Sequence, residues 1–325
     1  MRYLRRDEDS PNLSAARLLL RAAAEARTDV TSALRAWGRR GGIPLAWTMM
    51  RYHAALATGR NGTGRVRSIR LGGPDGQASG RGGTAVRCHF RTDLSDLFVL
   101  RETFVQQIYR FPYAEHLGQV TRILDLGSNI GLSPLYFAHL FPSAEIVCVE
   151  PVPGNTRLVQ ANRDRNGFGW RIEHKAVAAQ PGQVTLYTSG WWASSSTTWE
   201  VSERRRASVN RPESVLPAET RDVPAVTVRG VLDEAGWAHA DIVKMDIEGA
   251  EHEVLTSGET GWLSQVGILV LDIHGKYVDR QRILEVLAEH GFTAAAESGP
   301  HSAVFLSPTA RDRAERSVRP GGVNA

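Results

Sequence analysis

From residue 121 onward, short β-branched apolar runs alternate with amphipathic segments of helical periodicity. We expect strands at Arg122–Leu126, Glu145–Glu150, Arg171–Ala178, Gln183–Thr188, Asp241–Asp246, Gly267–His274, Phe292–Ala296 and Ala303–Leu306. We expect helices at Leu132–Leu140, Thr156–Asn166, Val228–Ala235, Ala250–Ser257 and Asp279–His290. This alternation is typical of βαβ units. It predicts an α/β fold with a mostly parallel sheet and helices on both faces.

The part of the chain before this alternation has a different pattern. Residues 10–58 carry apolar side chains at helical spacing, with a break expected at the glycines and proline that follow: Leu18, Leu19, Ala22, Ala26, Val30 and Leu34, then Gly41, Gly42 and Pro44. We interpret the apolar face as packing a helical layer on the main domain, although a partner or membrane surface would have the same pattern. Residues 59–83 are glycine-rich and predict a linker, with one strand at VRSIRL. TAVRCHF and DLFVLRETFVQQIY then predict a strand and a helix.

These patterns divide the chain into three parts. We expect an N-terminal helical region with its linker at residues 1–83, a main domain at 84–310, and a disordered tail at 311–325. The segment Gly190–Arg221 combines serine, tryptophan and arginine without periodicity, which is typical of a lid over an active site or of a disordered insertion.

Composition excludes several classes of protein. The formal net charge is +4, but the basic residues are scattered apart from Arg204–Arg206, so nucleic-acid binding is not expected. Two unpatterned cysteines, Cys88 and Cys148, predict neither a disulfide framework nor a zinc site. The first ten residues lack the apolar core of a signal peptide, and IPLAWTMMRYHAALA is too short and too interrupted to span a bilayer. We therefore expect a cytoplasmic protein without stable membrane insertion. The sequence is compatible with a homo-oligomer.

The glycine loop after the first strand of the main domain indicates a ligand. Its pattern is D-x-G-x-x-x-G, formed by Asp125, Gly127 and Gly131, and Asn129 stands where a dinucleotide fingerprint has its middle glycine. The loop therefore suits a ligand that comes close to the backbone but carries no phosphate. Asp125 could hold a cationic amino group, and Glu150 ends the next strand, where an acid can accept hydrogen bonds from ribose hydroxyls. Together these features point to S-adenosylmethionine.

At these residues the sequence resembles the FkbM family of S-adenosylmethionine-dependent methyltransferases. The resemblance rests on FRTDLSDLFVLRETF, ILDLGSNIG, VCVEPVPGNTRLVQAN, KAVAAQPGQVTLY, DIVKMDIEGAEHEVL and DIHGKY. It implies the class I methyltransferase fold, whose seven-stranded Rossmann-like sheet is parallel except for one strand near its edge. It also implies O-methylation of a sugar, a polyketide or another natural product. We place Pro151, Asn155 and Ala176, which lie in these motifs, in the cofactor site with Asp125, Gly127, Asn129, Gly131, Glu150 and Asp246.

Candidate catalytic residues lie at two further strand ends. Lys244 and Asp246 share one face of their strand, and Asp272 and His274 share one face of the next. A histidine or a carboxylate there could remove the proton from an acceptor hydroxyl, although Lys244 would serve equally well in a structural ion pair. Asp272 and Glu248, in the turn after Asp246, are candidates for substrate binding. Asp246 with Asp272 could instead hold a divalent cation such as Mg²⁺; we favour a site without metal.

Candidates for acceptor binding come from the aperiodic segment. Trp191, Trp192, Ser195 and Ser196 combine aromatic faces with hydroxyls, which suits sugar rings, but the tryptophans could simply seal a lid against the core. The leading hypothesis is a small-molecule O-methyltransferase. The alternatives are an NAD-dependent oxidoreductase, disfavoured by Asn129, and a non-catalytic interaction protein that kept the fold.

Overall fold

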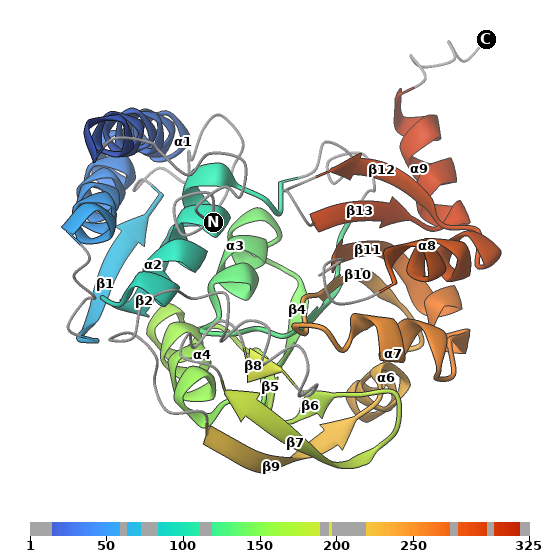
Figure 1. Ribbon diagram of the computed structural model, residues 1–325. Coiled ribbons are helices and arrows are strands. Elements are labelled where there is room, and N and C mark those ends of the chain that lie inside the picture. Colours follow the sequence, from blue (N-terminus) through green and yellow to red (C-terminus); the bar gives the residue numbers. More distant parts are fainter. Residues whose placement is uncertain are drawn as a thin grey trace, which may run out of the picture.

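The computed structural model describes residues 15–58, 64–72, 84–110, 119–188, 195–196, 219–273, 279–297 and 302–318. Its centre is a sheet of seven strands in the order β12-β13-β11-β10-β3-β4-β5 (Figure 1). Their bounds are β3 Arg122–Leu126, β4 Glu145–Val149, β5 Arg171–Glu173, β10 Ala240–Met245, β11 Val266–Asp272, β12 Thr293–Glu297 and β13 Ser302–Leu306. Only β13 runs antiparallel to its neighbours. This arrangement confirms the predicted class I methyltransferase sheet.

Helices cover both faces of this sheet, as predicted. Consecutive residues of β3 show why, because Ile123 packs into one hydrophobic cluster and Leu124 into another on the opposite face. Side chains of α3 and α4 fill the first cluster, and side chains of α6, α7 and α8 fill the second. The helix bounds are α3 Leu132–Leu140, α4 Pro153–Asn166, α6 Val228–Ala235, α7 Glu251–Thr256 and α8 Arg280–Glu289, with a 3₁₀ turn η3 at Gly261–Gln265.

A second sheet of four strands, in the order β6-β9-β7-β8, lies next to the β4 and β5 side of the main sheet (Figure 1). Its strands are β6 Ala176–Val177, β7 Gly182–Thr188, β8 Ser195–Ser196 and β9 Glu219–Val226. The single strand predicted at Arg171–Ala178 is wrong, since the chain leaves the main sheet after Glu173 and β6 pairs with β9. Strand β9 was not predicted, because it contains charged residues and Pro224, which pairs opposite Gln183.

The N-terminal region forms a layer on one side of the main domain. It consists of α1 Ala15–Thr58, β1 Val66–Leu71 paired antiparallel with β2 Val86–Arg91, α2 Leu94–Leu100 and the π-helix η1 Arg101–Gln106. The predicted break at Gly41, Gly42 and Pro44 is wrong, because α1 kinks earlier, at Gly38, whose φ is 60°. A Cβ on Gly42 would lie 2.7 Å from the Ala33 carbonyl oxygen, so this glycine lets the two halves of α1 pack closely.

Polar contacts hold α1 against η1. The Trp37 indole donates to the Phe104 carbonyl at 2.7 Å. Asp29 Oδ2 lies 2.6 Å from His53 Nε2 and accepts from Arg101 Nε at 2.5 Å. Val30 and Ala36 are partly buried and pack against the hydrophobic cluster that contains Ile123, whereas Leu34 is exposed. The layer therefore packs on the main domain through its inner face, and its outer face carries exposed apolar side chains.

The expected boundaries of the three parts remain proposals. Strands β1 and β2, which pair with each other, lie on either side of the division at residue 83. The segment expected as a tail begins inside helix α9, Pro308–Val318. No helix in the described ranges is long and apolar enough to cross a membrane.

We predict that Asp29→Asn lowers the free energy of unfolding by about 3 kcal/mol, because it leaves the half-buried Arg101 guanidinium without its buried carboxylate partner. Urea denaturation measures the loss. The control is Asp233→Asn, which removes an exposed carboxylate paired with Arg229 on α6 and should cost less than about 0.5 kcal/mol. Equal losses in the two variants would show that Asp29 does not anchor α1.

Candidate functional site

A cavity lies at the carboxyl ends of β3, β4 and β10, where open α/β sheets bind their ligands. It encloses about 550 Å³, part of it open to solvent. The structure brings eight of the predicted cofactor and substrate residues together in its lining: Gly127, Asn129, Glu150, Pro151, Asn155, Ala176, Asp246 and Glu248. Lys175, Val152 and Leu186 line it as well and were not predicted. Leu186 lies on β7, Lys175 lies between β5 and β6, and Val152 precedes α4; the sequence did not reveal that the second sheet brings the first two to the cavity.

Gly127 and Gly131 of the loop lie too close to neighbouring backbone for a larger residue to fit without strain. Gly127 has a φ of 76°, and a Cβ there would lie 1.9 Å from the Asp246 carbonyl oxygen on the neighbouring strand. Gly131 has a φ of 84°, and its Cβ would lie 3.1 Å from Val159 Cα on α4. Asn129 also has a left-handed φ of 50°. Gly127 thus allows two strand ends to meet, and Gly131 brings α3 close to α4.

Lys244 lies beneath the loop rather than in the cavity. Its ammonium donates to the Gly127 carbonyl at 2.6 Å and lies 3.3 Å from Asp125 Oδ1 and 3.7 Å from Asp246 Oδ2. Burial alone would lower the pKa of Lys244, but the carboxylates of Asp125 and Asp246 raise it well above its usual range. The charged ammonium therefore ties β10 to the loop, which is the structural role that the sequence left open for Lys244.

Asp125 is fully buried under the same loop. Its Oδ2 accepts from Ser133 Oγ at 2.6 Å, and Lys244 is its cation. Asp125 does not line the cavity, and in the structure it holds Lys244 and the start of α3; its contact with a ligand amino group stays a prediction.

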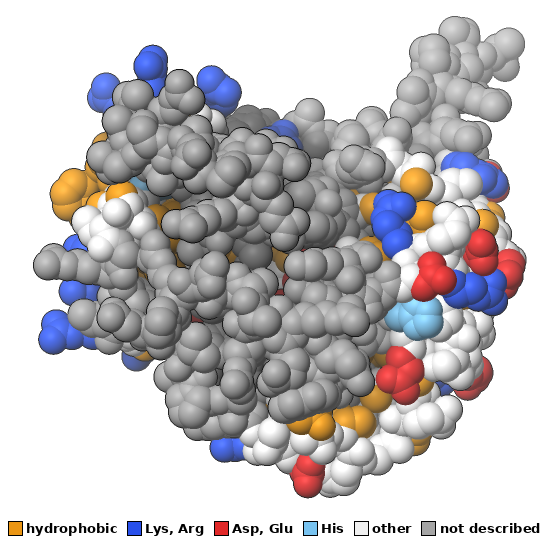
Figure 2. Space-filling view, viewed as in Figure 1, with side chains coloured by type: hydrophobic (Ala, Val, Ile, Leu, Met, Phe, Trp, Pro, Cys, Tyr) orange, Lys and Arg blue, Asp and Glu red, His pale blue; other side chains and the backbone are white. Residues whose placement is uncertain are grey.

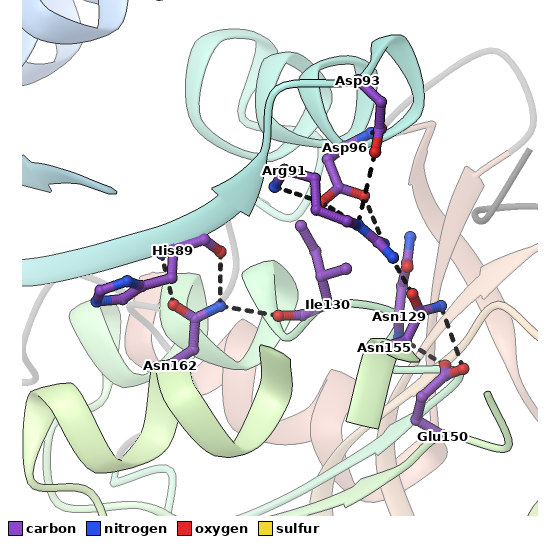
Figure 3. A network of polar contacts seen from close by, with 9 residues as sticks. All are labelled: His89, Arg91, Asp93, Asp96, Asn129, Ile130, Glu150, Asn155 and Asn162. Atoms are coloured by element: carbon purple, nitrogen blue, oxygen red, sulfur yellow. Dashed lines mark hydrogen bonds and ion pairs between the residues drawn. The ribbon is translucent and has the colours of Figure 1, made fainter. Parts of the chain in front are cut away.

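Glu150 is the buried acid on the cavity wall (Figure 3). Its Oε2 accepts from the Asn129 amide at 2.8 Å, and its Oε1 accepts from the Val152 amide at 2.9 Å and from Asn155 Nδ2 at 3.3 Å. Burial raises the pKa of Glu150 to about 7, although these hydrogen bonds lower it. A carboxylate has about four lone-pair sites, so Oε2 can accept a further hydrogen bond from a ligand.

A chain of contacts connects Glu150 to the N-terminal layer (Figure 3). Asn155 accepts from the Arg91 guanidinium at 2.8 Å, and Arg91 pairs with Asp96 at 2.8 Å. Nearby, Asn162 bridges two elements, because it donates to the Ile130 carbonyl at 2.8 Å and accepts from the His89 amide at 2.7 Å. The sequence did not predict Arg91 in the site, since only folding brings β2 beside α4.

The turn after β10 is fixed by Glu251. This carboxylate accepts from the Gly249 amide at 2.7 Å and from the Ile247 amide at 3.2 Å. Glu248 stands between them with a left-handed φ of 58°, a conformation that costs a non-glycine residue free energy and gathers at functional sites. The turn presents Asp246 and Glu248 to the cavity.

Glu102, on η1, faces the same strand ends. Burial, together with the negative charges of Asp272 and Asp246, raises the pKa of Glu102 to about 8. Burial likewise raises the pKa of Tyr109 well above its usual range, and Asp246 adds to that effect. Nothing in the sequence pattern placed Glu102 or Tyr109 near the strand ends, because both lie before the first strand of the central sheet, in or just after η1.

Several predicted residues lie outside the described part of the chain. These are His274, Trp191 and Trp192, with most of Gly190–Arg221. Ser195 and Ser196 form β8, whose backbone pairs with Tyr187 and Thr188 of β7. Within the described ranges no group of three or more His, Cys, Asp or Glu side chains has the geometry to hold a metal ion, so the suggested Mg²⁺ site at Asp246 and Asp272 gains no support.

Known proteins resemble this chain in sequence and in fold. The family model described as the methyltransferase FkbM domain matches residues 125–294. The chain is 26% identical to 31-O-demethyl-FK506 methyltransferase FkbM of Streptomyces tacrolimicus, over 62% of this chain and 84% of that protein. It is 28% identical to 2-O-methyltransferase NoeI of Sinorhizobium fredii, over 42% and 57%. Among solved structures, the METTL16 methyltransferase domain aligns with a TM-score of 0.37 at 12% identity, over 62% and 66%.

We predict that Gly127→Ala lowers the free energy of unfolding by at least about 3 kcal/mol, because the new methyl group meets the backbone of the neighbouring strand. The matched control is Gly236→Ala, which has a similar φ of 70° but open space around its Cβ, and should cost only about 1 kcal/mol. Thermal and urea unfolding measure both. Similar losses would mean that backbone strain, not the strand contact, dictates Gly127.

Proposed function

This chain belongs to the FkbM methyltransferase family, and from that premise we propose that it uses S-adenosylmethionine to methylate a hydroxyl of a small molecule. The observation that carries the proposal is the buried Glu150 carboxylate on the wall of the cavity. The glycine loop beside it lacks the pattern that binds a phosphate. A purine nucleoside with two ribose hydroxyls and no phosphate is the ligand that such a wall suits.

The lining of the cavity fits this ligand. Glu150 Oε2 would accept from a ribose hydroxyl, and Asn129 Oδ1 is buried without a hydrogen-bond partner among the described residues, so it can accept from the ligand as well. Val152, Ala176 and Leu186 form a small apolar cluster that lines the cavity and suits a flat base. S-adenosylmethionine, when bound, supplies an electrophilic methyl group on a sulfonium. The residues of the chain then have to orient the acceptor and take up its proton.

We place the acceptor beside Asp246 and Glu248, which line the cavity, and near Asp272 at the end of the neighbouring strand β11. Asp246 stands at the carboxyl end of β10, partly exposed, and we propose that it takes or relays the hydroxyl proton. His274, predicted from the sequence as the base, follows the end of β11 and lies outside the described residues. Glu102 faces the same strand ends, and because burial raises its pKa to about 8 its carboxyl group is largely protonated at neutral pH.

The type of acceptor is proposed from the relatives. Two of them are named for a reaction at an oxygen, at position 31 of an FK506 precursor and at a 2-O position. We propose a hydroxyl of a sugar, glycoside or polyketide-type natural product as the acceptor here. The match to a methyltransferase family speaks against the alternatives of an NAD-dependent oxidoreductase and a non-catalytic protein.

We predict that the affinity for S-adenosylmethionine, in the micromolar range, rises with pH because the ribose hydroxyls donate to ionised Glu150. Glu150 has a pKa of about 7 in the free protein, so its ionised fraction grows about tenfold between about pH 6 and about pH 8. Binding then releases a proton. Calorimetry measures both effects.

The control for this prediction is Glu150→Gln, which keeps the shape of the side chain and cannot ionise. It should bind more weakly and lose the part of the pH dependence that comes from the protein, while any titration of the ligand itself remains. An identical pH profile in Glu150→Gln and the native protein would remove Glu150 from the site.

We predict that Asp246→Asn lowers kcat by about 100-fold or more while the affinity for S-adenosylmethionine stays within about threefold, because the carboxylate acts on the acceptor. His274→Ala gives the same pattern if His274 is the base. A chelator separates these cases from a metal site, since loss of activity on chelation and recovery with Mg²⁺ would assign Asp246 and Asp272 to a cation. Full turnover of both variants in the presence of chelator would contradict the assignment of these strand ends.

A further inference from the structure

The outer face of the N-terminal layer carries an unusual surface. All five exposed large apolar side chains among the described residues lie in this layer: Leu34, Ile43, Trp47, Met50 and Val66. Trp47 is 59% exposed and Ile43 56%. Apolar side chains of this size are normally covered, and a concentration of them in one layer of the molecule marks a binding surface.

The three exposed apolar residues of α1 that follow the kink form one stripe. Ile43, Trp47 and Met50 follow each other at spacings of four and three, which places them on one side of the helix after the kink. Arg39 and Arg51 extend the same stripe, four residues before Ile43 and four residues after Trp47, and all five side chains are exposed. The outer face of the helix therefore carries an apolar strip with an arginine at each end.

The surrounding surface is positive. From residue 26 to residue 72 the only acidic residue is Asp29, which is buried and paired with His53 and Arg101. Eight exposed arginines lie in the same part of the layer: Arg27, Arg35, Arg39, Arg40, Arg51, Arg65, Arg67 and Arg70. Figure 2 shows the orange and blue side chains together at the edge that α1 and β1 occupy in Figure 1. We call this face, from Arg27 to Arg70, the basic apolar face.

We propose that the basic apolar face binds the surface of an anionic phospholipid bilayer. An amphipathic helix with arginines beside tryptophan and aliphatic side chains lies in the plane of the headgroups, where the arginines contact phosphates and the apolar strip enters the acyl boundary. Such a helix lies on the membrane and does not span it. The inner face of α1 stays on the protein, held by Trp37 and Asp29.

Two other occupants fit the chemistry less well. A nucleic acid would satisfy the arginines but would leave Ile43 and Met50 in water. A second copy of this chain placed face to face would bring its arginines against the same arginines, and between residues 26 and 72 there is no exposed acid to offset them. The bilayer surface offers negative charge and an apolar layer together.

Flotation with phosphatidylcholine vesicles, with and without phosphatidylglycerol, tests the proposal on the full-length protein. The native protein should float with the anionic vesicles and far less with the neutral ones, and raised salt should weaken the binding. Ile43→Ala combined with Trp47→Ala should lower the vesicle partition constant by at least about tenfold. Arg39→Gln combined with Arg40→Gln should lower it by about fivefold for each charge removed.

The matched control replaces two exposed arginines elsewhere, Arg229→Gln on α6 and Arg282→Gln on α8, and should leave vesicle binding unchanged. Circular dichroism and the affinity for S-adenosylmethionine should be native in all variants, so a failure here is separate from a failure of the proposed reaction.

Native protein that ignores anionic vesicles, or equal binding by the variants of the basic apolar face and the control, would overturn the proposal. Binding to a DNA or RNA duplex without binding to vesicles would assign the face to nucleic acid instead. A dimer in sedimentation that Trp47→Ala dissociates, without vesicle binding, would assign it to a second copy.

Discussion

The approach of two strand ends, with one buried ammonium beneath them, shapes the site. Gly127 at the end of β3 comes so close to the Asp246 carbonyl at the end of β10 that no side chain fits between them. Lys244 holds this contact by donating to the Gly127 carbonyl beside the Asp125 carboxylate. Because the ammonium is shut away from water, its partners have to stay close, and breaking one of them would leave a buried charge. The loop is therefore rigid where it faces the cavity.

The second constraint comes from outside the part of the chain that matches the family model. Arg91 of β2 holds Asn155, which donates to Glu150, so the acid on the cavity wall depends on a strand far away in the sequence. In turn β2 is fixed to α4 by Asn162, and η1 is fixed to α1 by Trp37. The N-terminal layer thus supports the cavity wall at Glu150 and, through η1, brings Glu102 to the strand ends that carry Asp246 and Asp272.

The sequence predicted what local pattern controls. The alternation of apolar runs located the central sheet and most helices, and the loop chemistry pointed to Glu150, which the structure places on the cavity wall. It did not predict what only packing decides. The kink of α1 lies at Gly38, whereas Gly42 serves the close packing of the two halves of the helix. Strand β9 has a polar sequence that the second sheet nevertheless pairs, and Arg91 reaches Asn155 only across the fold.

The most direct test of the account is a crystal structure of the protein with S-adenosylhomocysteine, the demethylated form of the proposed methyl donor. We expect the nucleoside in the cavity between Gly127 and Ala176, with a ribose hydroxyl at hydrogen-bond distance from Glu150 Oε2 and the sulfur toward Asp246. The Glu150 hydrogen bonds to the backbone of Asn129 and Val152 should persist. A nucleoside bound elsewhere, or a ribose that makes no contact with Glu150, would contradict the account.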